Sequence, residues 1–176
     1  MNLEDTIAAI STPLGTGGIG IIRVSGPKAE AVARTLFKPF KSLEVFVSHR
    51  LYHGDIVAPA SGAILDEVLL TMMKRPSSYT GEDTLEIYCH GGYLILQTVL
   101  NEIIKTGCRP AMPGEFTRRA FLNNRLDLSQ AEAVSDMIMA KTEKGLELAL
   151  SHLKGNLSET INRLRRRIIA ALALLE

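Results

Sequence analysis

The stretch GEDTLEIYCHGG, from Gly81 to Gly92, contains the clearest strand and the clearest turn of the sequence. Its middle is short, rich in Thr, Ile and Tyr, and bounded by Gly and Asp, which is typical of a β-strand. Side chains alternate along a strand, so this one presents an apolar and a polar face. The apolar face would carry Leu85, Ile87 and Cys89, and the polar face Thr84, Glu86, Tyr88 and His90.

The adjacent Cys89 and His90 invite a metal or nucleophile hypothesis, but strand alternation places them on opposite sides. No second Cys/His pair occurs at zinc-binding spacing, so we predict no metal site and interpret Cys89 as a small core residue. Glu86 lies either on a solvated outer face or on the wall of a pocket. The following glycines suit either a tight turn into a helix or an anion site at its N-terminus.

The sequence up to about residue 115 predicts an α+β domain with a mixed or antiparallel sheet. Residues 27–37 and 93–107 are predicted helices, since Pro27 suits a first-turn position and Gly107 a C-cap. The predicted strands are short, rich in β-branched residues and bounded by turn residues, and they span 5–12, 18–26, 49–57, 64–73 and 83–89.

From about residue 116 the pattern becomes helical, with Ser129 as the predicted N-cap and Glu132 completing a capping box. Two further helices are predicted over 141–156 and 157–176. The last has apolar residues at helical spacing up to the end of the sequence, so we expect an oligomer here or a longer parent chain. Those apolar residues are Ile161, Leu164, Ile168, Leu172 and Leu175.

Composition excludes several classes of protein. The 176 residues have a formal net charge of +1, so any RNA contact would have to be local. Two cysteines without a disulfide-rich pattern suit a reducing cytosol. The acidic N-terminus lacks the basic region of a signal peptide, and no uncharged apolar run is long enough to predict a transmembrane helix.

The glycine-rich GTGGIG, residues 15–20, leads into a strand instead of a helix, so it is not a dinucleotide fingerprint. A Gly–Lys–Ser/Thr sequence is also absent, so no Walker A motif is present. The segment is either a flexible turn or a loop that approaches a ligand or a second subunit closely.

Three arginine positions stand out. Arg23 lies in an apolar strand and either faces solvent or holds an anionic or carbonyl ligand, because Arg is seldom buried unpaired. Arg125 lies in a turn that is either a helix–loop–helix junction or a device presenting this side chain to a pocket. The run RLRRR, residues 163–167, is either a solvated helix face or a local RNA contact.

Three blocks in this order resemble signatures of the MnmE (TrmE) family of tRNA modification GTPases and cover nearly the whole chain. They are DTIAAISTPLGTGGIGIIRVSG at 5–26, SYTGEDTLEIYCHGG at 78–92 and RPAMPGEFTRRAFLNNRLDLSQAEAVSDMIMAKT at 109–142. The resemblance implies a folate-binding and dimerisation domain, similar in fold to the folate-binding part of aminomethyltransferase, at 1–118. Residues 119–176 would be the first helices of a split helical domain. The GTPase domain and the family's C-terminal Cys–x–Gly–Lys signature would belong to a longer parent.

The resemblance also implies the site. The family's folate contacts fall on Arg23, Glu86 and Arg125, where the family also has Lys. A carboxylate such as Glu86 can accept from the adjacent amino group and N–H of a pterin, and guanidinium groups can donate to the carbonyls and glutamate tail. No catalytic residue and no metal ligand are expected in this chain.

The cofactor would be 5-formyl- or 5,10-methylene-tetrahydrofolate, with GTP, Mg²⁺ and K⁺ bound by the parent. The parent would be a cytoplasmic homodimer that acts on C5 of the tRNA wobble uridine (U34) together with the FAD-containing MnmG (GidA). Two alternatives remain: a stand-alone folate-dependent one-carbon transferase and a helical interaction scaffold.

Overall fold

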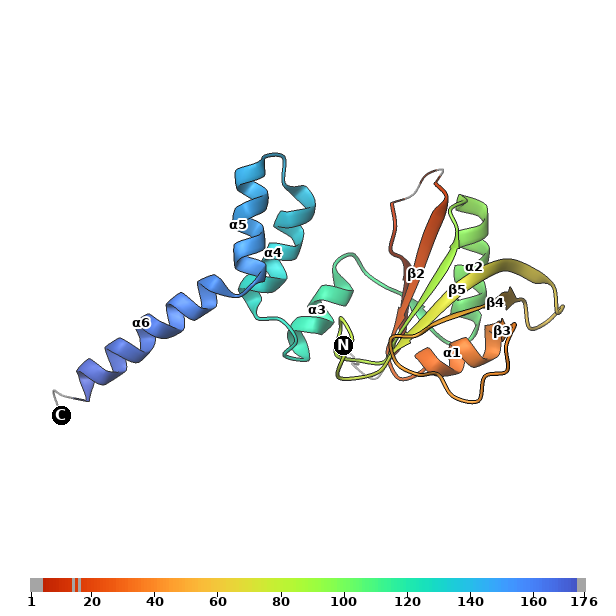
Figure 1. Ribbon diagram of the computed structural model, residues 1–176, viewed down its shortest axis with the longest axis horizontal. Coiled ribbons are helices and arrows are strands. Elements are labelled where there is room, and N and C mark those ends of the chain that lie inside the picture. Colours follow the sequence, from red (N-terminus) through yellow and green to blue (C-terminus); the bar gives the residue numbers. More distant parts are fainter. Residues whose placement is uncertain (1–4, 14, 16, 174–176) are drawn as a thin grey trace. The chain divides into compact units, whose positions relative to one another are not determined.

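The computed structural model describes residues 5–13, 15 and 17–173 and divides the chain into two compact units, Met1–Phe116 and Thr117–Glu176 (Figure 1). Each unit is described by itself. Thr16 of the glycine-rich segment and Leu175 of the C-terminal apolar repeat lie outside the described residues.

In the described part of the first unit, seven strands form one sheet in the order β3-β4-β5-β6-β2-β1-β7. Neighbouring strands are antiparallel except β1 and β7, which are parallel, so the predicted α+β fold with a mixed sheet is confirmed. The strands are β1 (Ile7–Ile10), β2 (Ile19–Ser25), β3 (Phe37–Pro39), β4 (Leu51–Val57), β5 (Ile64–Met73), β6 (Thr84–His90) and β7 (Arg109–Pro110).

Two helices, α1 (Ala29–Leu36) and α2 (Tyr93–Lys105), pack on one face of this sheet and form the core with it. Helix α2 ends two residues before the predicted end, with Thr106 as its C-cap. Gly107 follows the cap with φ +91, and its N–H donates to the Ile104 carbonyl at 3.0 Å. The core is built from the alternate apolar side chains of the central strands and the inward stripes of both helices: Ile22, Val24, Leu70, Met72, Leu85, Ile87, Val32, Leu36, Leu96, Val99 and Ile103.

The glycine at position 91 is explained by a close approach of two backbone segments. The Gly17 N–H donates to the Gly91 carbonyl at 3.1 Å, and the Gly91 N–H donates to the Gly18 carbonyl at 3.3 Å. A Cβ at Gly91 would lie 2.3 Å from the Gly17 carbonyl oxygen. The glycine-rich segment therefore approaches this chain's own backbone, an arrangement that neither predicted alternative included.

The second unit is helical, and α3 (Glu115–Leu122) leads into it. Helix α4 (Leu128–Met139) and helix α5 (Glu143–Leu153) pack side by side, and the Gln130 side chain donates to the Leu153 carbonyl at 2.9 Å (Figure 1). Helix α6 (Asn156–Leu172) follows, and none of its described residues is buried. No helix among the described residues combines the length and the apolar character that crossing a membrane requires.

The prediction that Ser129 caps α4 is wrong, because the N-cap is Asp127. The Asp127 carboxylate accepts from the Gln130 backbone N–H at 2.8 Å, and the Gln130 side chain accepts from the Asp127 N–H at 2.9 Å. Asp127 has the extended backbone of an N-cap (φ −82, ψ 174), whereas Ser129 already lies within the helix. The capping box therefore begins two residues earlier than expected.

The two faces of the sheet should differ in their sensitivity to substitution. Ile87 is fully buried at the centre of β6, so Ile87→Ala should lower the free energy of unfolding by about 2–5 kcal/mol through lost burial and an unfilled cavity. Ile19 on β2 is 68% exposed, so the matched Ile19→Ala should change it by less than about 0.5 kcal/mol. Chemical denaturation measures both, and equal losses would contradict this assignment of faces.

Candidate functional site

Arg23 and Glu86 lie directly opposite each other on the antiparallel strands β2 and β6 and form an ion pair. Arg23 Nε donates to Glu86 Oε1 at 2.8 Å, and Nη2 lies 2.7 Å from the same oxygen. The pair lies on the sheet face opposite the helices, and its side chains are 26% and 13% exposed, respectively. Each residue had been predicted to face either solvent or a ligand, and the structure gives each a protein partner.

Tyr88 also contacts the Glu86 carboxylate. Its hydroxyl donates to Glu86 Oε2 at 2.8 Å. Burial, together with this hydrogen bond, raises the pKa of Tyr88 to about 12. The phenol therefore keeps its proton at neutral pH and holds the carboxylate in one orientation.

Aromatic rings surround the guanidinium of Arg23. Its Cζ lies 5.3 Å from the centroid of the Tyr79 ring and 5.5 Å from that of Phe116, both within cation–π range. Neither ring was singled out from the sequence, since a strand arginine and rings 56 and 93 positions away give no local signal. The ion pair thus lies beside flat apolar surfaces that suit a planar heterocycle.

The segment that carries Tyr79 is fixed by a buried hydroxyl network. The Ser25 hydroxyl lies 2.7 Å from Thr80 Oγ1 and donates to Glu82 Oε2 at 2.7 Å, and Thr80 Oγ1 lies 3.2 Å from Thr84 Oγ1. These bonds tie the SYTGED segment to the ends of β2 and β6. The aromatic wall beside Arg23 is therefore held in place by strand residues.

The pair keeps hydrogen-bonding capacity for a ligand. An ionised carboxylate offers about four lone-pair sites, and three donors already approach Glu86: Arg23 Nε and Nη2 at Oε1, and the Tyr88 hydroxyl at Oε2. The Nη1 group of Arg23 has no hydrogen-bond partner among the described residues. The Glu86 carboxylate therefore keeps room for a further N–H donor at Oε2, and Arg23 can donate to a carbonyl or carboxylate.

Arg125 lies in the second unit, in the turn between α3 and α4. Asn124 adopts φ +57, and the Arg125 N–H donates to the Ala120 carbonyl at 2.8 Å, so the turn is tightly closed. The Arg125 side chain is exposed. The structure therefore brings two of the predicted site residues together on the sheet and places the third on a turn of the helical unit.

The partner of His90 is Asp66 of β5, not the adjacent Cys89. The buried Asp66 carboxylate accepts from the His90 N–H at 2.8 Å, and its other oxygen lies 2.6 Å from His90 Nδ1. The hydrogen bond and charge of Asp66 raise the pKa of His90. Cys89 points into the core, where burial raises its pKa to about 12, so it remains an unreactive thiol.

No group of three or more metal-ligating side chains gathers in the part of the chain that the structure describes. The residues instead form an ion pair with aromatic neighbours on the open face of a mixed sheet, and a helical unit follows in the chain. These features define an α+β domain that is followed in the chain by a helical domain.

Comparison with known proteins identifies the family. The family described as GTP-binding protein TrmE N-terminus matches residues 6–125, and the MnmE helical domain matches residues 128–176. The chain belongs to the MnmE (TrmE) family.

Curated relatives with similar sequences align with almost the whole of this chain. The proteins named tRNA modification GTPase MnmE from Syntrophus aciditrophicus and Carboxydothermus hydrogenoformans are 59% and 57% identical over 174 and 176 residues. The corresponding protein from Geobacter metallireducens is 54% identical over 176 residues. These alignments cover 99–100% of this chain but 38% of each relative, so the chain spans well under half of their length.

The Asp66–His90 contact predicts a pH dependence. Because the pKa of His90 is raised, the contribution of this pair to stability is fully present below about pH 6.5, the ordinary value, and is lost as pH rises through the raised pKa. Titration followed by NMR should show the His90 midpoint above that value, and Asp66→Asn should move it back.

The matched control is Glu67→Gln, since Glu67 adds only the smallest contribution to the raised pKa of His90. It should shift the His90 midpoint less than Asp66→Asn does. An unchanged midpoint in Asp66→Asn would show that the contact does not persist in solution.

Proposed function

We propose that this chain is the folate-binding and dimerisation module of a tRNA-modifying GTPase. Residues 1–118 would form the folate-binding domain, and residues 119–176 would begin the helical domain. Relatives named tRNA modification GTPase MnmE support a tRNA-modifying GTPase as the parent protein. The observation that carries the folate proposal is the Arg23–Glu86 pair, with Tyr88 on the carboxylate and aromatic rings on the guanidinium.

Glu86 recognises the pterin in this proposal. The exocyclic amino group and neighbouring ring N–H of a pterin lie side by side and match the two oxygens of a carboxylate. Because Arg23 and Tyr88 already orient that carboxylate, little side-chain freedom is lost when the ligand binds. The flat ring lies against Tyr79 and Phe116, whose faces are already directed at the pair.

Arg23 and Arg125 supply the donors. The Nη1 group of Arg23 and the guanidinium of Arg125 donate to folate carbonyl oxygens or to carboxylates of the glutamate tail. Arg125 keeps the charge of the Lys found elsewhere in the family but adds a planar, forked donor.

The remaining chemistry belongs to the parent. We propose that 5-formyl- or 5,10-methylene-tetrahydrofolate supplies the one-carbon unit for C5 of U34, with FAD provided by MnmG. GTP, Mg²⁺ and K⁺ would bind in the parent's GTPase domain in the cytoplasm. We expect no GTP hydrolysis by this chain alone, because its sequence contains no Gly–Lys–Ser/Thr motif to hold the phosphates.

Titration calorimetry with 5-formyltetrahydrofolate tests the site. The 176-residue chain should bind saturably, and Arg23→Ala and Glu86→Gln should each weaken binding at least about tenfold, since hydrogen bonds to charged groups contribute about 1.5–3 kcal/mol. Arg125→Ala should weaken it in the same direction.

Glu67→Gln is the matched control for Glu86→Gln, because Glu67 is an exposed carboxylate on the neighbouring strand β5, bonded to His53 at 2.8 Å. It should bind folate as the unaltered chain does. A folded chain that binds no folate would favour the helical-scaffold alternative, and turnover of methylene-folate by the chain alone would favour the one-carbon transferase.

The open sheet face also supports a homodimer through the N-terminal domain. This face exposes large apolar side chains that include Leu51 and Leu69, with 57% and 43% of their area accessible. Light scattering should give the mass of a dimer at micromolar concentration, and Leu69→Glu should shift the chain toward monomer. A monomeric mass for the unaltered chain would exclude this assembly.

A further inference from the structure

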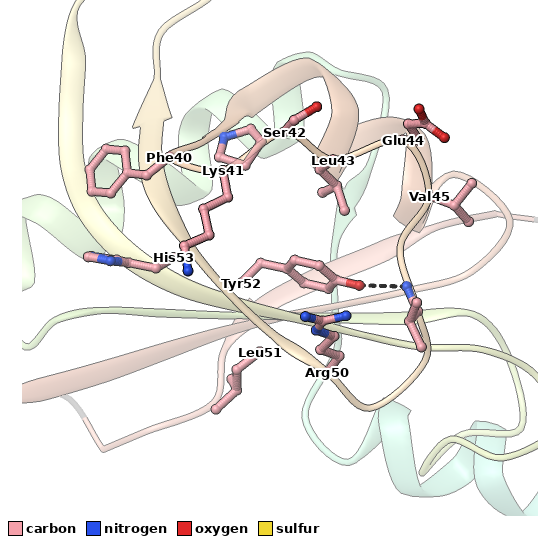
Figure 2. Close-up of a pocket in the computed structure, with 12 residues that line it drawn as sticks. Phe40, Lys41, Ser42, Leu43, Glu44, Val45, Arg50, Leu51, Tyr52 and His53 are labelled. Carbon is pink, nitrogen blue, oxygen red and sulfur yellow. Dashed lines mark hydrogen bonds between the residues drawn. The ribbon is translucent and has the colours of Figure 1, made fainter.

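A cavity of about 650 Å³ lies between β4 and the loop that joins β3 to it, within the first unit (Figure 2). This volume lies within the range of about 300–1,000 Å³ typical of small-molecule sites. The loop leaves the sheet after Phe40, whose N–H donates to the His53 carbonyl at 3.0 Å. Neither the ion pair at Arg23 nor any other predicted site residue lines this cavity.

The far side of the loop is fixed by Tyr52. Its hydroxyl accepts from the Val47 N–H at 2.6 Å, and its ring packs edge-on against the buried Phe46 with centroids 5.3 Å apart. The loop is therefore anchored at both ends, and the space between it and β4 is preformed. Figure 2 shows the Tyr52 ring crossing this space, with Leu43 above it and Arg50 below it.

Two cations border the cavity without an acidic partner among the described residues, Lys41 and Arg50. Arg50 Cζ lies 5.9 Å from the centroid of the Tyr52 ring, and the Lys41 side chain extends across the loop toward β4, beside His53 (Figure 2). The one carboxylate that lines the cavity, Glu44, is directed away from it in the same view. The charges around the cavity therefore favour an anionic ligand.

Aromatic surface is available beside these cations. Phe40 is 54% exposed and packs edge-on against His53, with ring centroids 4.7 Å apart. An exposed aromatic face next to unpaired cations is the combination that binds single-stranded nucleic acid, because bases stack on the ring and phosphates neutralise the cations. A simple inorganic anion would leave the aromatic surface unused.

We propose that this cavity binds a single-stranded segment of RNA, with Lys41 and Arg50 on its phosphates and a base against Phe40. The proposal rests on the proposed function in one respect, because it takes RNA to be the substrate of the parent protein. This agrees with the relatives' name, tRNA modification GTPase. The chain's net charge of +1 gives no general attraction for RNA, so binding depends on this local arrangement.

Fluorescence anisotropy with a short fluorescein-labelled single-stranded RNA of mixed sequence tests the proposal on the whole chain. Lys41→Ala and Arg50→Ala should each weaken binding several-fold. Each should also lower the slope of log K against log salt by about 0.7, the value for one phosphate contact on a single strand. Phe40→Ala should weaken binding while leaving the slope unchanged, because it removes stacking and no charge.

Lys144→Ala is the matched control, since Lys144 is an exposed lysine of α5 in the second unit. Lys144→Ala should leave the RNA affinity and the slope of log K against log salt unchanged. A Lys41→Ala/Arg50→Ala double variant that binds RNA no more weakly than this control overturns the proposal. Binding of inorganic phosphate or a free mononucleotide at these residues, without any effect on RNA, also overturns it.

Folate titration of the same variants separates this proposal from the proposed function. Substitutions at Lys41 and Arg50 should leave 5-formyltetrahydrofolate binding unchanged. A chain that binds RNA through this cavity but binds no folate would contradict the folate site alone, and the reverse result would contradict the RNA site alone.

Discussion

The antiparallel register of β2 and β6 is the constraint on which the rest of the first unit depends. It sets Arg23 opposite Glu86 on one face and Ile22 opposite Ile87 on the other. A slip of one residue would turn the ion pair toward the helices and the isoleucines toward solvent. The hydrophobic core and the candidate site are therefore specified by the same strand pairing.

Ion pairing on this face has a functional consequence beyond stability. At 26% and 13% exposure the two side chains are only partly desolvated, so their pairing contributes modestly to folding. Its larger effect is geometric, because Arg23 and Tyr88 hold the Glu86 carboxylate in one orientation before any ligand arrives. A preoriented carboxylate beside aromatic rings favours a planar ligand with adjacent N–H donors over a flexible anion.

The sequence correctly predicted the features that depend on the local order of residues. The longer strands, the alternation that separates Cys89 from His90 and the end of α2 near Gly107 all agree with the structure. The short strands β3 and β7 were missed, because two or three residues show no periodicity. The N-cap of α4 was placed at Ser129 because the sequence offers two overlapping capping patterns, and the extended backbone of Asp127 decides between them.

Side-chain partners on neighbouring strands could not be predicted from the local sequence pattern. Arg23 and Glu86 are 63 positions apart, and Asp66 and His90 are 24 apart, so only the strand register reveals them. The cavity bordered by Lys41 and Arg50 was missed for the same reason, since it exists only where a loop is held away from β4. Family resemblance supplied the three site residues, and the structure adds the partners that orient two of them.

A crystal structure of this chain with 5-formyltetrahydrofolate tests the central claim most directly. The account predicts the pterin amino group and ring N–H within hydrogen-bond distance of the Glu86 carboxylate, with Arg23 and Tyr88 still bonded to it and the ring against Tyr79 or Phe116. A pterin bound elsewhere, with the Arg23–Glu86 pair untouched by ligand, would contradict it.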